Sequence, residues 1–338
     1  MSFKNALKLL LSKYRLFWVI LLFLLAVFVV LASLSVSFAI NIYRALEAAG
    51  IGGYLGEFVR FMLGGNGLGQ TVEKLGELTA RIARLFSTDP ILRANSTLWI
   101  ILVLTVVYRF LLGLYELPLI RVLRGALREN GRYGFVASLF PHFGKVCLFS
   151  LLKMAVMTLY DAAMGVVLYY LVRLVLLTGL TLLVPFVFAL AFLCLLVLRF
   201  GLISGWAPAV LEEKMNPFRA LGYSVRQFFG AFGPLFSLFA VVWILMIAIN
   251  ALVGVFTFGA GLVVTVPLFM LFINCLNIVF YYNHHTKRYY IEGKIFDPAD
   301  AGAAGSSVPE PGAEAAKAPK TAEAAEGSAA GEENGHEQ

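Results

Sequence analysis

The chain has 338 residues, of which 60% are hydrophobic and 14% are charged. Soluble domains carry about 25% charged residues, so the composition excludes a water-soluble globular protein and predicts a chain covered by lipid. The net charge is +7, and residues 297–338 hold nine acids and two lysines, which leaves +14 on residues 1–296. That surplus is scattered between apolar segments, a pattern that disfavours a nucleic-acid partner and favours loops held against anionic headgroups.

Six apolar segments are long enough to cross a bilayer, which takes roughly 20 residues at 1.5 Å each. In chain order, the predicted spans are Leu16–Ile40, Leu98–Tyr115, Val146–Leu171, Leu180–Ile203, Phe232–Val255 and Gly261–Tyr282. The loop at residues 41–97 is predicted to lie outside. Between the third and fourth spans, only Arg173 and Thr178-Gly179 interrupt a long apolar stretch, which we interpret as a tight outer hairpin. The predicted fold class is therefore an all-α integral membrane bundle of about six transmembrane helices.

The first span could also be a signal peptide, because a basic flank precedes it and Ser37-Phe38-Ala39 loosely resembles a cleavage site. Its apolar run, however, exceeds the 7–15 residues of a typical signal peptide. We therefore predict an uncleaved anchor.

The short loops between spans carry basic residues on the same side as the basic N-terminus. These residues are Arg121, Arg124, Arg128, Arg132, Lys145, Lys214, Arg219, Arg226, Lys287, Arg288 and Lys294. Because basic loops stay inside, the protein is predicted to sit in the cell membrane with both termini in the cytoplasm.

A segment of mixed polarity precedes each odd-numbered span and is predicted to form an amphipathic helix on the cytoplasmic face. The three segments are Phe3–Tyr14, Ile120–Phe140 and Pro208–Phe229. One interpretation is a threefold repeat of surface helix and membrane hairpin. The other is that they are ordinary connectors that carry topology charges.

The C-terminal tail, residues 297–338, is rich in Ala, Glu, Gly and Pro. Such a segment buries too little apolar surface to offset its chain entropy, so we predict a disordered acidic tail after a transmembrane domain at residues 1–296.

Four ionisable residues within the predicted spans are the main candidates for a site, because a charge in hydrocarbon is costly. Arg109 and Glu116 lie seven residues apart on the second span, and Lys153 and Asp161 lie eight apart on the third. The two spans are consecutive and antiparallel. We therefore predict an intramembrane charged seam, with Glu116 and Lys153 toward the cytoplasmic side and Arg109 extending toward Asp161. The seam could relay protons or ions, or it could simply join the two helices, and the structural interpretation is favoured because no span is broken at its centre.

Other polar residues in the spans point to structure rather than chemistry. Asn274 and Asn277 are predicted to hydrogen-bond to neighbouring helices, and Arg173 and Arg199 to extend to the nearer interface. The three cysteines show neither disulfide nor zinc-site spacing. Motifs for nucleotide binding, serine hydrolysis and metalloproteolysis are absent from the sequence, so we expect no enzymatic activity, no metal and no cofactor.

Residues 201–230 carry a resemblance. An apolar-Glu turn, Leu211-Glu212-Glu213, ends one span, and an Ala-Leu-x-x-Ser helix, Ala220 to Ser224, leads into the next. This pattern resembles bacterial polytopic membrane proteins of unknown function, including relatives of the membrane domain found beside glycerophosphoryl diester phosphodiesterases. The resemblance implies a six-helix membrane module. It implies no hydrolase activity, since the phosphodiesterase domain itself is absent.

Two functions remain open from the sequence. The first is a non-enzymatic membrane module that binds lipid, including anionic headgroups, or a protein partner, which could be a second copy of the chain. The second is a small transporter or lipid-translocating protein that uses the region around Arg109 and Asp161.

Overall fold

The structure is a computed structural model that describes residues 2–64, 68–88, 90–128, 134–291 and 294–298. It divides into two units, Met1–Asp297 and Pro298–Gln338. The helices and strands of the described residues lie in the first unit. The predicted disordered tail lies outside the described residues, apart from its first two.

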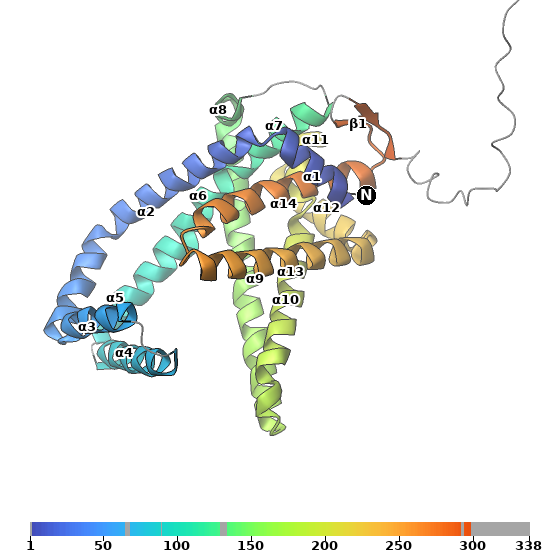
Figure 1. Cartoon of the computed structure of the whole chain (residues 1–338). Helices are drawn as coiled ribbons and strands as arrows, with labels where there is room; N and C mark the ends of the chain where they lie inside the picture. The colour runs from blue at the N-terminus through green and yellow to red at the C-terminus, as the bar shows by residue number, and fades with distance from the viewer. Residues whose placement is uncertain (1, 65–67, 89, 129–133, 292–293, 299–338) are drawn as a thin grey trace, which may run out of the picture. The chain divides into compact units, whose positions relative to one another are not determined.

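Six helical segments are long and apolar enough to cross a membrane: Arg15–Ala48, Pro90–Arg128, Phe135–Leu177, Thr181–Glu212, Phe232–Phe256 and Leu262–His284. Each predicted span falls on one of them, so the predicted all-α membrane fold is confirmed. The helices that form these segments are α2 (Arg15–Ala48), α5 (Pro90–Trp99), α6 (Tyr108–Leu114), α7 (Glu116–Arg128), α9 (Phe143–Leu177), α10 (Val184–Ile203), α13 (Phe232–Phe256) and α14 (Leu262–His284), shown in Figure 1. A π-helical stretch, Ile100–Val107, joins α5 to α6.

Shorter elements complete the unit. They are α1 (Ser2–Ser12), α3 (Ile51–Leu63), α4 (Leu68–Thr88), α8 (Phe135–Leu139), α11 (Trp206–Glu212), α12 (Pro217–Gly230), two 3₁₀ turns (Phe140–His142 and Thr181–Leu183) and the strands β1 (Tyr289–Ile291) and β2 (Lys294–Phe296). The strands pair as an antiparallel hairpin, with Tyr290 opposite Ile295. The loop predicted at residues 41–97 holds α3 and α4, which pack on each other.

The hairpin between α9 and α10 lies where the sequence placed it, although α9 continues to Leu177 rather than ending at Leu171. Gly179 takes a left-handed backbone conformation with φ +76°, which glycine adopts without a steric penalty. Pro185 stands in the first turn of α10, where its missing N–H costs nothing. Because the turn reverses the chain, α9 and α10 run side by side (Figure 1).

Helix α14 forms the centre of the unit. In α14, 61% of the span is buried inside the protein, against 11–17% in the other five. It packs against α1, α2, α7, α11 and α13. The other five spans therefore present most of their apolar surface outward, where lipid would cover it.

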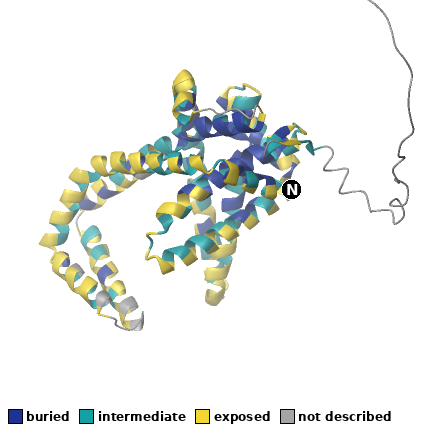
Figure 2. Ribbon diagram, turned by 45° about the horizontal axis from the view of Figure 1, so that its top comes forward, coloured by how far each residue is buried: buried dark blue, intermediate teal, exposed yellow. Residues whose placement is uncertain are grey.

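The segments predicted as surface helices pack against other helices of the same chain. On α7, Leu119, Leu123 and Leu127 are fully buried, and so is Trp206 of α11. Figure 2 shows the buried residues gathered at this end of the unit, near the N-terminus. The apolar faces of α7 and α11 therefore contact other helices of the chain and form a core next to the spans.

Close packing between α10 and α12 depends on a glycine. A methyl group on Gly201 would overlap the ring of Phe228, which is fully buried. We expect Gly201→Ala to destabilise the fold by about 1–3 kcal/mol, because the core must shift to admit it. The matched control is Gly222→Ala on α12, where an added methyl group meets nothing within 4 Å. Thermal unfolding in detergent measures both, and equal melting temperatures would contradict the packing.

Candidate functional site

A cavity of about 260 Å³ lies among α6, α7, α9, α10, α13 and α14. Its charged lining residues are Arg109, Glu116, Lys153 and Arg199. Its apolar lining comes from methionine, aromatic and aliphatic side chains: Leu112, Met154, Met157, Phe200, Ile203, Trp243, Met246, Met270 and Ile273. The cavity therefore combines charge with apolar walls inside the membrane-spanning part of the chain.

The first charged pair joins α7 to α9. Lys153 donates a hydrogen bond to Oε2 of Glu116, and the two side chains are 21% and 6% exposed. Glu116 stands in the first turn of α7, where the helix dipole stabilises a negative charge. The pair thus neutralises two charges that would be costly separately.

The second charged group is a carboxylate held by two guanidinium groups. Arg109 Nη2 lies 2.6 Å from Asp161 Oδ2, and Arg199 Nη2 lies 3.2 Å from the same oxygen. Arg109 also donates to Thr158 Oγ1 at 3.2 Å. The other carboxylate oxygen, Oδ1, is buried and has no hydrogen-bond partner among the described residues.

Both contacts of the predicted seam are therefore present in the structure. The prediction for Arg199 was wrong, since its guanidinium meets Asp161 rather than extending to the interface. The contact with the carboxylate of Asp161 on the adjacent helix stabilises the guanidinium group of Arg199 more than the polar headgroup region would. A signal for this contact existed in the sequence, because Asp161 and Arg199 lie at similar distances from the turn at Thr178-Gly179 and so share a depth in the hairpin. Arg173, by contrast, is exposed.

Unpaired polar atoms add to the site. Asn274 donates to the carbonyl of Met270 at 2.7 Å and to the hydroxyl of Tyr115 at 3.4 Å, which satisfies its amide nitrogen. Its amide oxygen, that of Asn277 and the indole nitrogen of Trp243 are buried with no partner among the described residues. Buried polar atoms normally have a hydrogen-bond partner. These three atoms have none within the described protein, so a ligand or water could bind to them.

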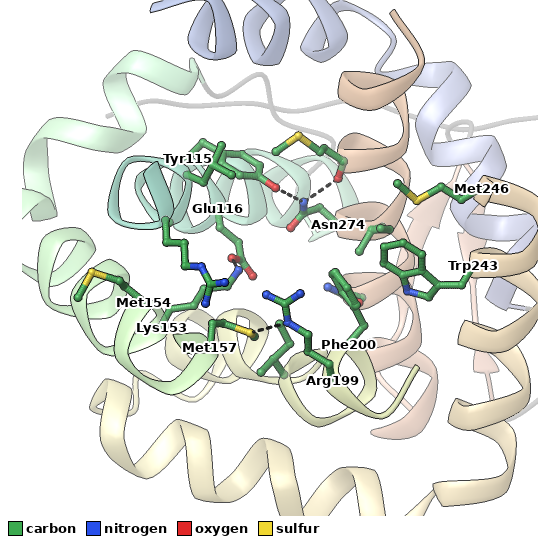
Figure 3. Close-up of a pocket in the computed structure, with 17 residues that line it drawn as sticks. Tyr115, Glu116, Lys153, Met154, Met157, Arg199, Phe200, Trp243, Met246 and Asn274 are labelled. Atoms are coloured by element: carbon green, nitrogen blue, oxygen red, sulfur yellow. Dashed lines mark hydrogen bonds and ion pairs between the residues drawn. The ribbon is translucent and has the colours of Figure 1, made fainter. Parts of the chain in front are cut away.

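Figure 3 shows how the lining is divided. The guanidinium group of Arg199 points into the middle of the pocket, with Glu116 and Lys153 on one side and Trp243 and Met246 on the other. Three cations and two carboxylates, counting Asp161, leave an excess of one positive charge. A group that carries negative charge or hydrogen-bond acceptors fits the charged side, and a hydrocarbon chain fits the other.

A separate charged contact lies at the end of the fourth candidate span, Thr181–Glu212. Glu212 of α11 accepts hydrogen bonds from Tyr282 at 2.5 Å and pairs with Arg124 Nε at 2.8 Å. Its side chain is only 5% exposed. Because these partners lie on α14 and α7, the carboxylate ties three helices together.

The neighbouring carboxylate gives a pH-dependent prediction. Glu213 accepts hydrogen bonds from Lys287 at 2.6 Å and Tyr281 at 2.9 Å, and the bond from Lys287 is the main reason that its pKa lies below the ordinary value of 4.5. A carboxylate with a lowered pKa stabilises the fold at higher pH, and the stabilisation is lost as the pH falls through the folded-state pKa. We expect the gap in melting temperature between the wild type and Glu213→Gln to shrink as the pH falls from neutral to below 4.5. A gap that stays constant over this range would contradict the linkage.

The described residues contain no group of three or more His, Cys, Asp or Glu side chains that could hold a metal ion. The fold and the pocket together define a multi-pass helical membrane protein with a charged, apolar-walled pocket in its spans. No protein-family model, no curated protein and no solved structure matches the chain. The resemblance at residues 201–230 stays a prediction.

Proposed function

We propose that this protein is a non-enzymatic membrane module that binds a lipid in the pocket among α6, α7, α9, α10, α13 and α14. The observation that carries the proposal is a cavity whose lining has more cations than carboxylates and is otherwise rich in methionine and aromatic side chains, with Trp243 and Met246 across Arg199 from Glu116 and Lys153 (Figure 3). Its volume of about 260 Å³ suits a headgroup with the first part of one acyl chain. The basic short loops support a location in the cell membrane with both termini in the cytoplasm.

The charged side of the pocket suits the head of an anionic lipid. Arg109 and Arg199 already share one carboxylate oxygen, and guanidinium groups retain further N–H donors that match phosphate oxygens. Across Arg199 from Glu116 and Lys153, the unpaired indole N–H of Trp243 offers a further donor. A lipid phosphate placed here would gain charge-assisted hydrogen bonds while its chain extends along the apolar wall.

The test is a titration of delipidated protein in detergent with phosphatidylglycerol, followed by thermal unfolding. A ligand that binds only the folded state stabilises it by about 2.7 kcal/mol at a hundredfold excess over its Kd, so a saturable rise in melting temperature is expected. Arg199→Gln should weaken the response, because it removes a donor while Arg109 still neutralises Asp161. The matched control, Arg173→Gln, changes an exposed arginine of α9 outside the pocket.

A second variant tests the apolar wall of the pocket without changing the charge of the pocket. Met246→Trp adds bulk to the apolar wall and should also weaken the response. If both pocket variants respond to phosphatidylglycerol like Arg173→Gln, the pocket is not the lipid site.

One observation favours a second candidate function, a small transporter or lipid-translocating protein. Asp161 Oδ1 is a buried acceptor without a partner among the described residues, and Asp161 pairs with Arg109 and Arg199, two of the cations that line the pocket. Such an atom could receive a proton or a ligand donor. In proteoliposomes, Asp161→Asn that folds normally but loses a proton- or solute-linked flux would favour transport over binding.

A further inference from the structure

A second pocket, of about 240 Å³, lies where α7, α8, α11 and the start of α9 meet. It shares no lining residue with the first pocket. Lys145, at its edge, precedes Lys153 by eight residues on α9, which corresponds to about 12 Å along the helix. It therefore lies nearer the end of the spans that carries the basic loops.

The lining of this second pocket is strongly basic. It includes Arg121, Arg124, His142, Lys145 and Lys214, and no Asp or Glu. Arg124 is already paired with Glu212. In the described parts of the chain, no carboxylate oxygen lies within 4 Å of the charged nitrogens of Arg121, Lys145 or Lys214. Three cations thus converge on one cavity without compensation.

Local structure holds these side chains around the cavity. Arg121 Nη1 donates to the carbonyl of Ser138 at 3.3 Å and lies 3.5 Å from Nδ1 of His142. Lys214 follows α11 with φ +52°, a left-handed conformation that is uncommon for a residue with a side chain. Backbone strain of this kind is often found at binding sites.

The floor and the surroundings of the pocket indicate the ligand. The floor is apolar, with Leu117, Val146 and Val210 each at most 3% exposed. Beside it, Phe140 and Phe143 flank His142 in the chain and are 67% and 49% exposed. Aromatic side chains next to cations are typical of headgroup depth in a membrane.

From this convergence, we propose that the second pocket binds a phosphate group, with Arg121, Lys145 and Lys214 as its donors. The phosphate could belong to an anionic lipid headgroup or to a free phosphate, and the exposed phenylalanines favour the lipid. Phosphate suits the site because its oxygens accept several charge-assisted hydrogen bonds at once. The proposal does not depend on lipid binding in the first pocket.

The test uses the full chain in detergent, titrated separately with dioctanoyl phosphatidic acid and with inorganic phosphate while thermal unfolding is monitored. We expect saturable stabilisation by phosphatidic acid, and Lys145→Gln/Lys214→Gln should raise its apparent Kd about tenfold or more. The matched control, Lys4→Gln/Arg219→Gln, removes two exposed cations that do not line the pocket. All variants are measured in an Arg199→Gln background, so that any response from the first pocket is weakened and is the same in every variant compared.

The outcomes separate the two phosphate sources. Stabilisation by phosphatidic acid that inorganic phosphate does not match assigns the site to a lipid headgroup, and equal stabilisation assigns it to free phosphate. The proposal is overturned if neither probe acts saturably, or if the Lys145/Lys214 variant binds like the control. If the double variant fails to fold, Arg121→Gln alone should give the same weakening, and unchanged binding there also overturns the proposal.

Discussion

Replacing Lys153 by methionine is expected to destabilise the fold by about 3–5 kcal/mol, because it leaves a buried carboxylate without a partner. Glu116 is only 6% exposed, and Lys153 is its ion-pair partner. In the membrane-spanning part of the chain, a charge without a partner is costly. The loss should appear as a lower melting temperature and a lower yield of monodisperse protein in detergent.

A double variant distinguishes loss of pairing from loss of packing. Glu116→Gln/Lys153→Met removes both charges, so it should recover most of the stability that Lys153→Met loses. Arg173→Met is the matched control, since it removes an exposed cation from the same helix, α9. A double variant no more stable than Lys153→Met alone would show that the ion pair does not account for the loss.

Trp206→Ala is expected to cost about 3–5 kcal/mol, the usual range for removing a large aromatic side chain from a core. Trp206 is fully buried on α11, and its ring meets the edge of Phe149 at a centroid distance of 5.1 Å. Its indole nitrogen donates to the carbonyl of Pro217 at 2.8 Å. The side chain therefore joins α9, α11 and the start of α12.

Two further variants separate the contribution of the hydrogen bond from that of apolar burial. Trp206→Phe keeps most of the apolar volume but removes the hydrogen bond, so its cost should be about 1–3 kcal/mol. Trp18→Ala changes a tryptophan that is 58% exposed on α2 and should change stability little in detergent. Thermal unfolding of all three gives the comparison. Similar losses for Trp206→Ala and Trp18→Ala would contradict a core at this end of the unit.

The six spans could be predicted from the sequence because their hydrophobicity and length are local properties. The end of α9 was harder to predict, since Arg173 falls inside a continuous apolar run and looks like the start of a loop. An exposed arginine is tolerated there, and the helix ends only where Gly179 takes its left-handed conformation.

The seam could be predicted because helical spacing and antiparallel order place Arg109 near Asp161 and Glu116 near Lys153. The contact of Arg199 was missed, although the similar distances of Asp161 and Arg199 from the turn at Thr178-Gly179 indicate a shared depth in the hairpin. The pocket itself could not be predicted from the sequence. Its lining comes from α6, α7, α9, α10, α13 and α14, and only the tertiary structure brings these helices together.

The core that α7 and α11 form next to the spans also could not be predicted from the sequence. An apolar stripe on a helix such as α7 can face either a bilayer or another helix, and both alternatives give the same pattern of residues. Burial of Leu119, Leu123 and Leu127 shows contact with protein. The hairpin of β1 and β2 follows the last span and was not predicted from the sequence.

The central claim, a lipid bound within the first pocket, is tested most directly by a photoreactive diazirine residue placed at position 246. Met246 lines the pocket, whereas the adjacent Leu245 is 41% exposed and lies outside it. Protein carrying the label at either position is exchanged into detergent, irradiated and analysed by mass spectrometry of its peptides. We expect a lipid adduct at position 246, because lipid bound in the pocket survives detergent exchange, and no adduct at position 245. Equal labelling at both positions, or no adduct at 246, would contradict a lipid in the pocket.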